Sequence, residues 1–190
     1  MTNKELMNEY DKSHIQTIKE MIKVGQINPF MHIIAKEPGE EKAVILHIDI
    51  PATNDMTKEL FARHGIPSLK EDLKKSGMEL LFVTFTSESW IRKVKVEKEG
   101  DPIPDNWRDE VPDEVVMVAY SSAEGESIHV YDIIRDEYAI NDNGDLVEKV
   151  YESDKDGNLY KKVEMVYNEE LSGDDGEYGG SYSNLYNQLT

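Results

Sequence analysis

One apolar stretch, Glu79–Trp90, constrains the fold of this chain more than any other segment. Every residue from Leu80 to Thr86 is apolar or β-branched, so a strand here would bury both of its faces. We therefore expect the central strand of a sheet that is covered on each side. The polar step Ser87-Glu88-Ser89 is expected to end this strand and to lead into Trp90, one of two tryptophans in the chain.

The residues before this strand predict helices. Apolar side chains recur at helical spacing over residues 2–24, which begin with a capping box at Thr2 and Glu5 and are followed by Gly25. Two shorter helices are predicted between residues 54 and 76. The first ends at Gly65, and the second opens at a Ser68 capping box and stops before Gly77.

A hairpin is predicted between the long helix and the shorter ones. Its strands, Phe30–Lys36 and Lys42–Ile50, flank the turn sequence Glu37-Pro38-Gly39-Glu40. A register centred on Pro38 and Gly39 collects apolar side chains on one face, namely Met31, Ile33, Ala35, Val44, Leu46 and Ile48. On the opposite face, this register sets His32 against Ile45 and makes His47 its diagonal neighbour.

Later segments complete an α+β fold: a largely antiparallel sheet with an N-terminal helix and two short helices packed on it, and a C-terminal β-meander extension. Two strands, Val115–Ser121 and Ser127–Ile134, follow a loop that contains three prolines. Residues 1–136 are expected to form the α+β core domain. Residues 137–167 form an acidic β-meander that extends the same sheet or makes a small lobe. Residues 168–190 are expected to be a mobile acidic tail rich in Gly, Ser and Tyr.

The charge distribution suggests a partner. Residues 1–100 carry 16 acidic and 15 basic side chains, whereas residues 101–190 carry 23 and 6, so nearly all of the net charge of −18 belongs to the second half. Direct nucleic-acid binding is disfavoured, because binding phosphates requires Lys and Arg. We expect a binding protein that engages a basic protein or imitates nucleic acid. An acidic surface that only confers solubility is the alternative.

Several function classes lack their sequence signatures. There is no cysteine, no phosphate-binding Gly-rich loop, no G-x-S-x-G and no H-E-x-x-H. We therefore expect a non-catalytic protein without a cofactor. No signal peptide or apolar run of about 20 residues is present, so a cytoplasmic protein outside the membrane is expected.

Two groups of residues are candidate sites. His32, His47 and Asp49 share one face of the hairpin and could ligate a divalent metal or form an acid–base pair, or they could simply mark the margin of the core.

The second group comprises Glu88, Trp90, Trp107 and Arg108. Tryptophans with an arginine could hold a nucleotide-like ligand, which would make the chain a small ligand-sequestering protein or an enzyme. A turn at the strand end, with Trp90 anchored in the core, is the alternative.

The pattern over residues 78–135 resembles a widespread set of small uncharacterised proteins of prokaryotes, phages and plasmids. The shared features are an apolar strand ending in Glu88-Ser89-Trp90, a loop running from Pro102 to Pro112, and a second strand at Glu114–Val118. The resemblance implies a setting on mobile elements, where an inhibitor of a host factor would fit. It implies no activity, cofactor or site residues.

Overall fold

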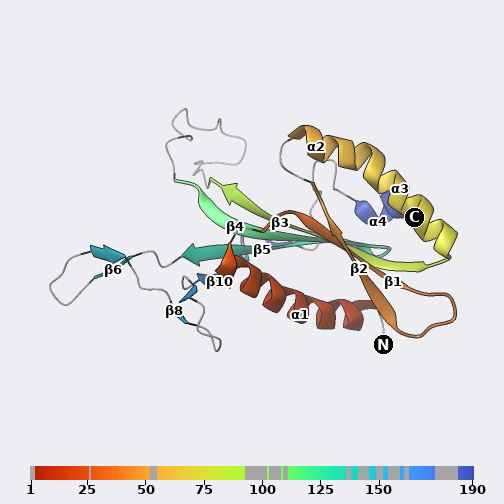
Figure 1. Ribbon diagram of the computed structural model, residues 1–190, viewed down its shortest axis with the longest axis horizontal. Coiled ribbons are helices and arrows are strands. Elements are labelled where there is room, and N and C mark those ends of the chain that lie inside the picture. Colours follow the sequence, from red (N-terminus) through yellow and green to blue (C-terminus); the bar gives the residue numbers. More distant parts are fainter. Residues whose placement is uncertain are drawn as a thin grey trace.

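A six-stranded antiparallel sheet forms the centre of the molecule (Figure 1). The computed structural model describes residues 3–25, 27–51, 55–92, 102, 108, 111–135, 138–140, 146–148, 152–153, 159–160, 163–173 and 184–190. The strand order is β10-β5-β4-β3-β1-β2. The bounds of these strands are β1 Phe30–Lys36, β2 Ala43–Asp49, β3 Glu79–Ile91, β4 Asp113–Ser122, β5 Gly125–Arg135 and β10 Val163–Tyr167.

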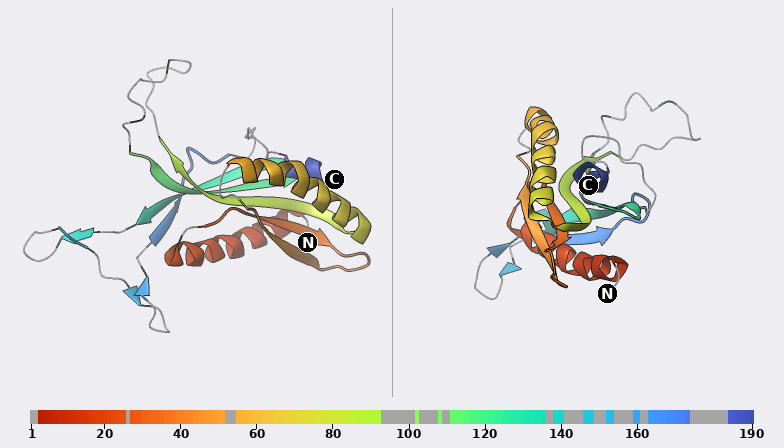
Figure 2. Two further views of the ribbon diagram at one scale, coloured as in Figure 1. Left: turned by 45° about the horizontal axis from the view of Figure 1, so that its top comes forward. Right: turned by 90° about the vertical axis from the view of Figure 1, so that its right-hand side faces the viewer.

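Helices cover both faces of the sheet, which confirms the predicted α+β fold (Figure 2). Helix α1 (Asn3–Val24) packs on one face. The other face carries α2 (Asp55–Leu60), η1 (Phe61–Gly65), α3 (Ile66–Ser76) and α4 (Leu185–Leu189). None of the described helices is both long enough and apolar enough to cross a membrane.

Strand β3 is the central strand that the sequence predicted. It pairs with β1 on one side and β4 on the other, and Phe82 and Val83 are both fully buried. Because successive side chains of a strand point to opposite faces, Phe82 joins the core under α1 and Val83 joins the core under α3. The expected strand end at Ser87 is wrong, because pairing with β4 continues to Ile91.

The β1–β2 hairpin has the predicted faces but a different pairing. A turn closes at the predicted residues, with the Glu40 N–H donating to the Glu37 carbonyl over 3.1 Å and Gly39 at φ 82°. The chain adds Glu41 and Lys42 before β2 begins, so the ladder shifts by two residues from the predicted centre. As a result, His32 lies directly opposite His47 and not opposite Ile45.

The two short helices are present, but Gly65 does not separate them. Gly65 has a right-handed φ of −68°, and a π-helical turn joins α2 to α3. In this turn the Ile66 N–H bonds to the carbonyl of Phe61, five residues earlier. Pro67 follows and has no N–H to donate, so the wider turn falls where the α-helical ladder would lose a bond anyway.

The C-terminal part contributes one strand to the sheet and one helix to its cover. Strand β10 pairs with β5, and Asn168 continues along this edge by donating its N–H to the Val130 carbonyl over 2.8 Å. The composition predicts a mobile tail over residues 168–190, but Asn168, Leu185 and Leu189 are buried. Leu185 and Leu189 lie four residues apart on α4 and pack in the core under α3. Two further strand pairs stand apart from the main sheet: β6 (Tyr138–Ile140) with β7 (Leu146–Glu148), and β8 (Glu152–Ser153) with β9 (Leu159–Tyr160).

Candidate functional site

Polar aromatic side chains gather on the sheet face that α1 covers. The chain has five histidines, and four of them belong to this side: His14 from α1, His32 from β1, His47 from β2 and His129 from β5. Tyr10 and His14 are four residues apart on α1, so both point down onto the sheet. They are 8% and 3% exposed. A core built this way is unusual, because the side chains are polar and still buried.

Three of these side chains join Asp49 and Thr84 in one hydrogen-bonded line, which we call the polar line: Asp49, His47, His32, Tyr10 and Thr84. The Asp49 carboxylate lies 3.1 Å from His47 Nε2, and His47 Nδ1 lies 2.8 Å from His32 Nε2. His32 Nδ1 lies 2.6 Å from the Tyr10 hydroxyl, which lies 2.9 Å from Thr84 Oγ1. The Asp49 side chain is 86% exposed, whereas Thr84 is fully buried, so the line runs from solvent into the core.

When both imidazoles are neutral, one assignment of protons satisfies every bond in the polar line. The Asp49 carboxylate only accepts, so His47 must donate from Nε2 and accept at Nδ1. His32 then donates from Nε2 and accepts at Nδ1 from the Tyr10 hydroxyl, which in turn accepts from Thr84. All donors in this assignment therefore point toward Asp49.

His14 lies against this line. Its ring stacks on Tyr10 with centroids 4.9 Å apart, and its Nε2 lies 2.8 Å from the hydroxyl of Thr86. Burial, together with the charge that a protonated His32 would carry, lowers the pKa of His14 to about 3. Burial next to His47 lowers the pKa of His32 to about 4. Neither ring is charged near neutral pH.

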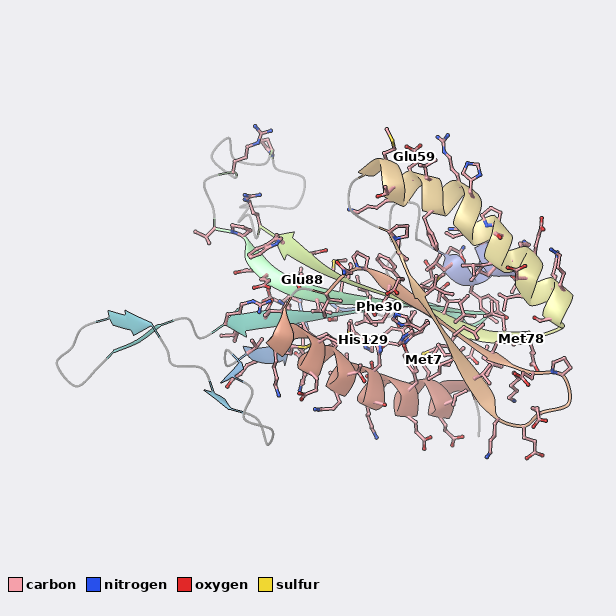
Figure 3. The ribbon with its side chains drawn as sticks, viewed as in Figure 1. Met7, Phe30, Glu59, Met78, Glu88 and His129 are labelled. Carbon is pink, nitrogen blue, oxygen red and sulfur yellow. The ribbon has the colours of Figure 1, made fainter. Side chains whose placement is uncertain are left out.

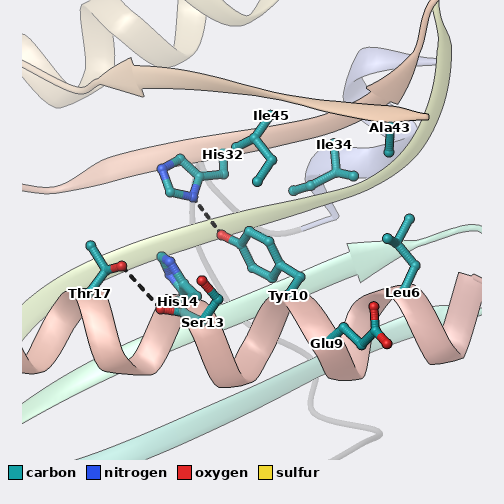
Figure 4. A pocket seen from close by; sticks show the side chains of 10 residues that line it. All are labelled: Leu6, Glu9, Tyr10, Ser13, His14, Thr17, His32, Ile34, Ala43 and Ile45. Carbon is teal, nitrogen blue, oxygen red and sulfur yellow. Dashed lines mark hydrogen bonds between the residues drawn. The ribbon is translucent and has the colours of Figure 1, made fainter.

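A cleft of about 320 Å³ opens between α1 and the hairpin, directly beside the polar line (Figure 4). We call it the α1 cleft. Leu6 and Tyr10 extend from the helix toward Ile34 and His32 on the strands. One end of the cleft is apolar, and the other is lined by aromatic rings and the polar helix residues beside them. The lining residues are Leu6, Glu9, Tyr10, Ser13, His14, Thr17, His32, Ile34, Ala43 and Ile45.

A second polar group lies farther along the underside of α1. The Asp11 carboxylate accepts a hydrogen bond from the Tyr120 hydroxyl and lies 3.6 Å from His129 Nδ1, between α1 and β5 (Figure 3). Burial alone would raise the pKa of Asp11, but the nearby His129 and the Tyr120 hydroxyl bring it below its usual value. This group ties the helix to β4 and β5 and is separate from the α1 cleft.

The predicted group of Glu88, Trp90, Trp107 and Arg108 is placed only in part. Glu88 accepts the Ile27 N–H over 3.0 Å just beyond α1, and burial raises its pKa. Trp90 is 60% exposed, so it is not the core anchor offered as the alternative. Arg108 is exposed, and Trp107 lies outside the described residues. A nucleotide-like ligand between them stays a prediction.

The predicted metal group is brought together as a line. The atoms with which His32, His47 and Asp49 face one another are hydrogen-bonded to each other. Among the residues that the structure describes, no three His, Cys, Asp or Glu side chains are arranged to hold a metal ion.

Sequence reasoning found His32, His47 and Asp49 but missed the residues that complete the site. Tyr10, His14, Thr84 and Thr86 come from a helix and a strand that lie far apart in the chain. One signal was available, because Thr84 and Thr86 are the polar positions of an otherwise apolar strand and fall on one face. Only the structure shows which residues of α1 meet them.

Comparison of the chain with family models, with curated proteins and with solved structures returned no match.

Proposed function

We propose that this protein binds a small ligand in the α1 cleft. The observation that carries the proposal is the polar line, because two of its hydrogen-bonded members, Tyr10 and His32, line the cleft. Burying polar side chains costs desolvation free energy, which a core of aliphatic residues in the same space would avoid. A satisfied polar network instead fixes the orientation of every ring in it, which is what a preorganised binding wall requires.

The lining favours binding over catalysis. Tyr10 and His32 use their polar atoms on each other and on their neighbours in the line, so these atoms are not left over for acid–base work on a ligand. The opposite end offers aliphatic contacts from Leu6, Ile34 and Ile45. The volume is at the lower end of the range typical for small-molecule sites. A compact ligand with an apolar body suits these walls.

A fragment screen by NMR on the isotope-labelled protein tests this function. We expect binders to shift the amide signals of the cleft residues. Ile45→Trp should fill the cleft and abolish those shifts. Ile134→Trp is the matched control, because Ile45 and Ile134 are both exposed strand isoleucines, at 56% and 47%. If no fragment shifts the cleft signals, or if the two variants behave alike, the proposal is wrong.

A second candidate function rests on charge. Residues 101–190 carry a net charge of −17, which supports a basic protein partner, or imitation of nucleic acid in a phage or plasmid setting. The test is competition with DNA for a basic DNA-binding protein at low and high salt. Displacement of DNA at low salt that weakens at high salt supports this function. No displacement at either salt concentration counts against it.

A further inference from the structure

The lining of the α1 cleft contains one charged side chain, and it is acidic. Glu9 is the only Asp, Glu, Lys or Arg among the lining residues, and it is exposed on the rim beside Tyr10 and Ser13. Asp49 stands at the outer end of the polar line. An anionic ligand would therefore meet repulsion without a basic side chain in the lining to compensate for it.

The aromatic wall, formed by Tyr10, His14 and His32, has few free polar atoms. The rings of His14 and His32 lie 5.0 Å apart, and each contacts Tyr10 at 4.9 and 5.9 Å respectively. The hydroxyl of Tyr10 and both ring nitrogens of His32 are already hydrogen-bonded. Because both histidines stay neutral, as their lowered pKa values indicate, the wall carries no positive charge of its own. The face of a tyrosine ring attracts a cation.

We propose that the ligand of the α1 cleft is an organic cation with an apolar body, an ammonium compound in the simplest case. Its charged nitrogen lies between the Glu9 carboxylate and the ring wall of Tyr10 and His14. Its apolar body packs on the aliphatic end of the cleft, against Leu6, Ile34, Ala43 and Ile45. This inference rests on the proposed function, because it names the class of ligand for the same cleft.

Three probes of nearly equal size and different charge test the inference: 2-phenylethylammonium, 2-phenylethanol and phenylacetate. Dissociation constants come from NMR titration of the full chain, followed at the cleft signals. We expect the ammonium compound to bind about tenfold more tightly than the alcohol, the size of a partly desolvated cation–π contact. Phenylacetate should bind most weakly.

Variants separate the contribution of the Glu9 charge from that of apolar contacts in the cleft. Glu9→Gln should weaken binding of the ammonium compound several-fold and leave 2-phenylethanol unchanged. Glu124→Gln is the matched control, because it removes one exposed carboxylate at the β4–β5 turn and should change neither affinity. Glu9 is exposed, so neither substitution threatens folding.

The outcomes distinguish this inference from the function on which it rests. If the alcohol and the ammonium compound bind equally, or if phenylacetate binds best, the cation inference is overturned while a ligand-binding cleft stands. If none of the probes shifts the cleft signals, the cation inference fails, and the fragment screen decides the proposed function separately. A preference for the ammonium compound that Glu9→Gln removes supports both.

Discussion

The two faces of the sheet belong to the same strands, but one carries apolar side chains and the other carries hydrogen-bonded polar ones. Under α3 and α4, the core around Ile33 and Val83 is apolar. Under α1, the adjacent residues of the same strands, His32 and Thr84, belong to the hydrogen-bonded line that runs from solvent into the core. Because β1 and β3 supply both cores, the difference lies in the side chains alone. One face therefore provides stability, and the other combines stability with a preorganised cleft wall.

The largest effect is expected from the apolar face. Ile33 is fully buried, so Ile33→Ala leaves a cavity and should lower the free energy of unfolding by about 2–5 kcal/mol. Chemical denaturation measures the loss. Affinity of the α1 cleft for 2-phenylethylammonium should stay unchanged, because Ile33 points away from it. A loss of affinity would show that the two faces are not independent.

The pH dependence of stability should come from the polar face. Folded His14 has a pKa of about 3, below its ordinary 6.5, so the unfolded chain takes up a proton first as the pH falls. Stability is therefore full above pH 6.5 and declines as the pH falls from 6.5 toward 3, by about 1.4 kcal/mol per pH unit for His14. Folded His32, with a pKa of about 4, adds to the decline between pH 6.5 and 4. Denaturation across this range measures the slope.

Two histidine variants sharpen the pH prediction. His14→Gln removes the buried imidazole and should flatten the decline. His64→Gln removes an exposed histidine of η1 and should leave the decline as it is. Equal slopes in both variants would contradict a role for His14.

A smaller effect is expected from breaking the polar line at its centre. Tyr10→Phe removes the hydroxyl that bonds both His32 and Thr84, which should cost about 1–3 kcal/mol because polar atoms are left unpaired. Adding Thr84→Val to this variant removes one of those unpaired groups. The double variant should therefore cost less than the two single changes together. Strict additivity, measured by denaturation, would show that the two hydroxyls do not interact.

The smallest effect is expected at the outer end of the line. Asp49 is 86% exposed, and its bond to His47 is screened by water, so Asp49→Asn should change stability by less than about 1 kcal/mol. The NMR signals of the His47 ring should nevertheless move, because the Asn amide is uncharged and can donate as well as accept, whereas the carboxylate only accepts. A large loss of stability would mean that Asp49 anchors the whole line.

Local sequence patterns predicted most of the fold. Helical spacing predicted α1, and alternation predicted both faces of the hairpin. Details that depend on tertiary context were wrong: β3 passes through Ser87 because β4 pairs with it there, and Gly65 sits in a π turn next to Pro67. Three of the five members of the polar line were predicted, namely His32, His47 and Asp49. The rest were not, because Tyr10 meets Thr84 across 74 residues of chain, and no spacing rule reports such a contact.

The hairpin loop, residues 37–42, carries a consequence for the descent of this protein. Surface loops ordinarily lengthen and shorten freely among related chains. Here a change of one residue would turn His47 to the other face of the sheet, and a change of two would slide it away from His32. Relatives that share this cleft should therefore keep the length of the loop while its sequence varies. In an alignment of such relatives, a loop without insertions or deletions would indicate the site even where the histidines differ.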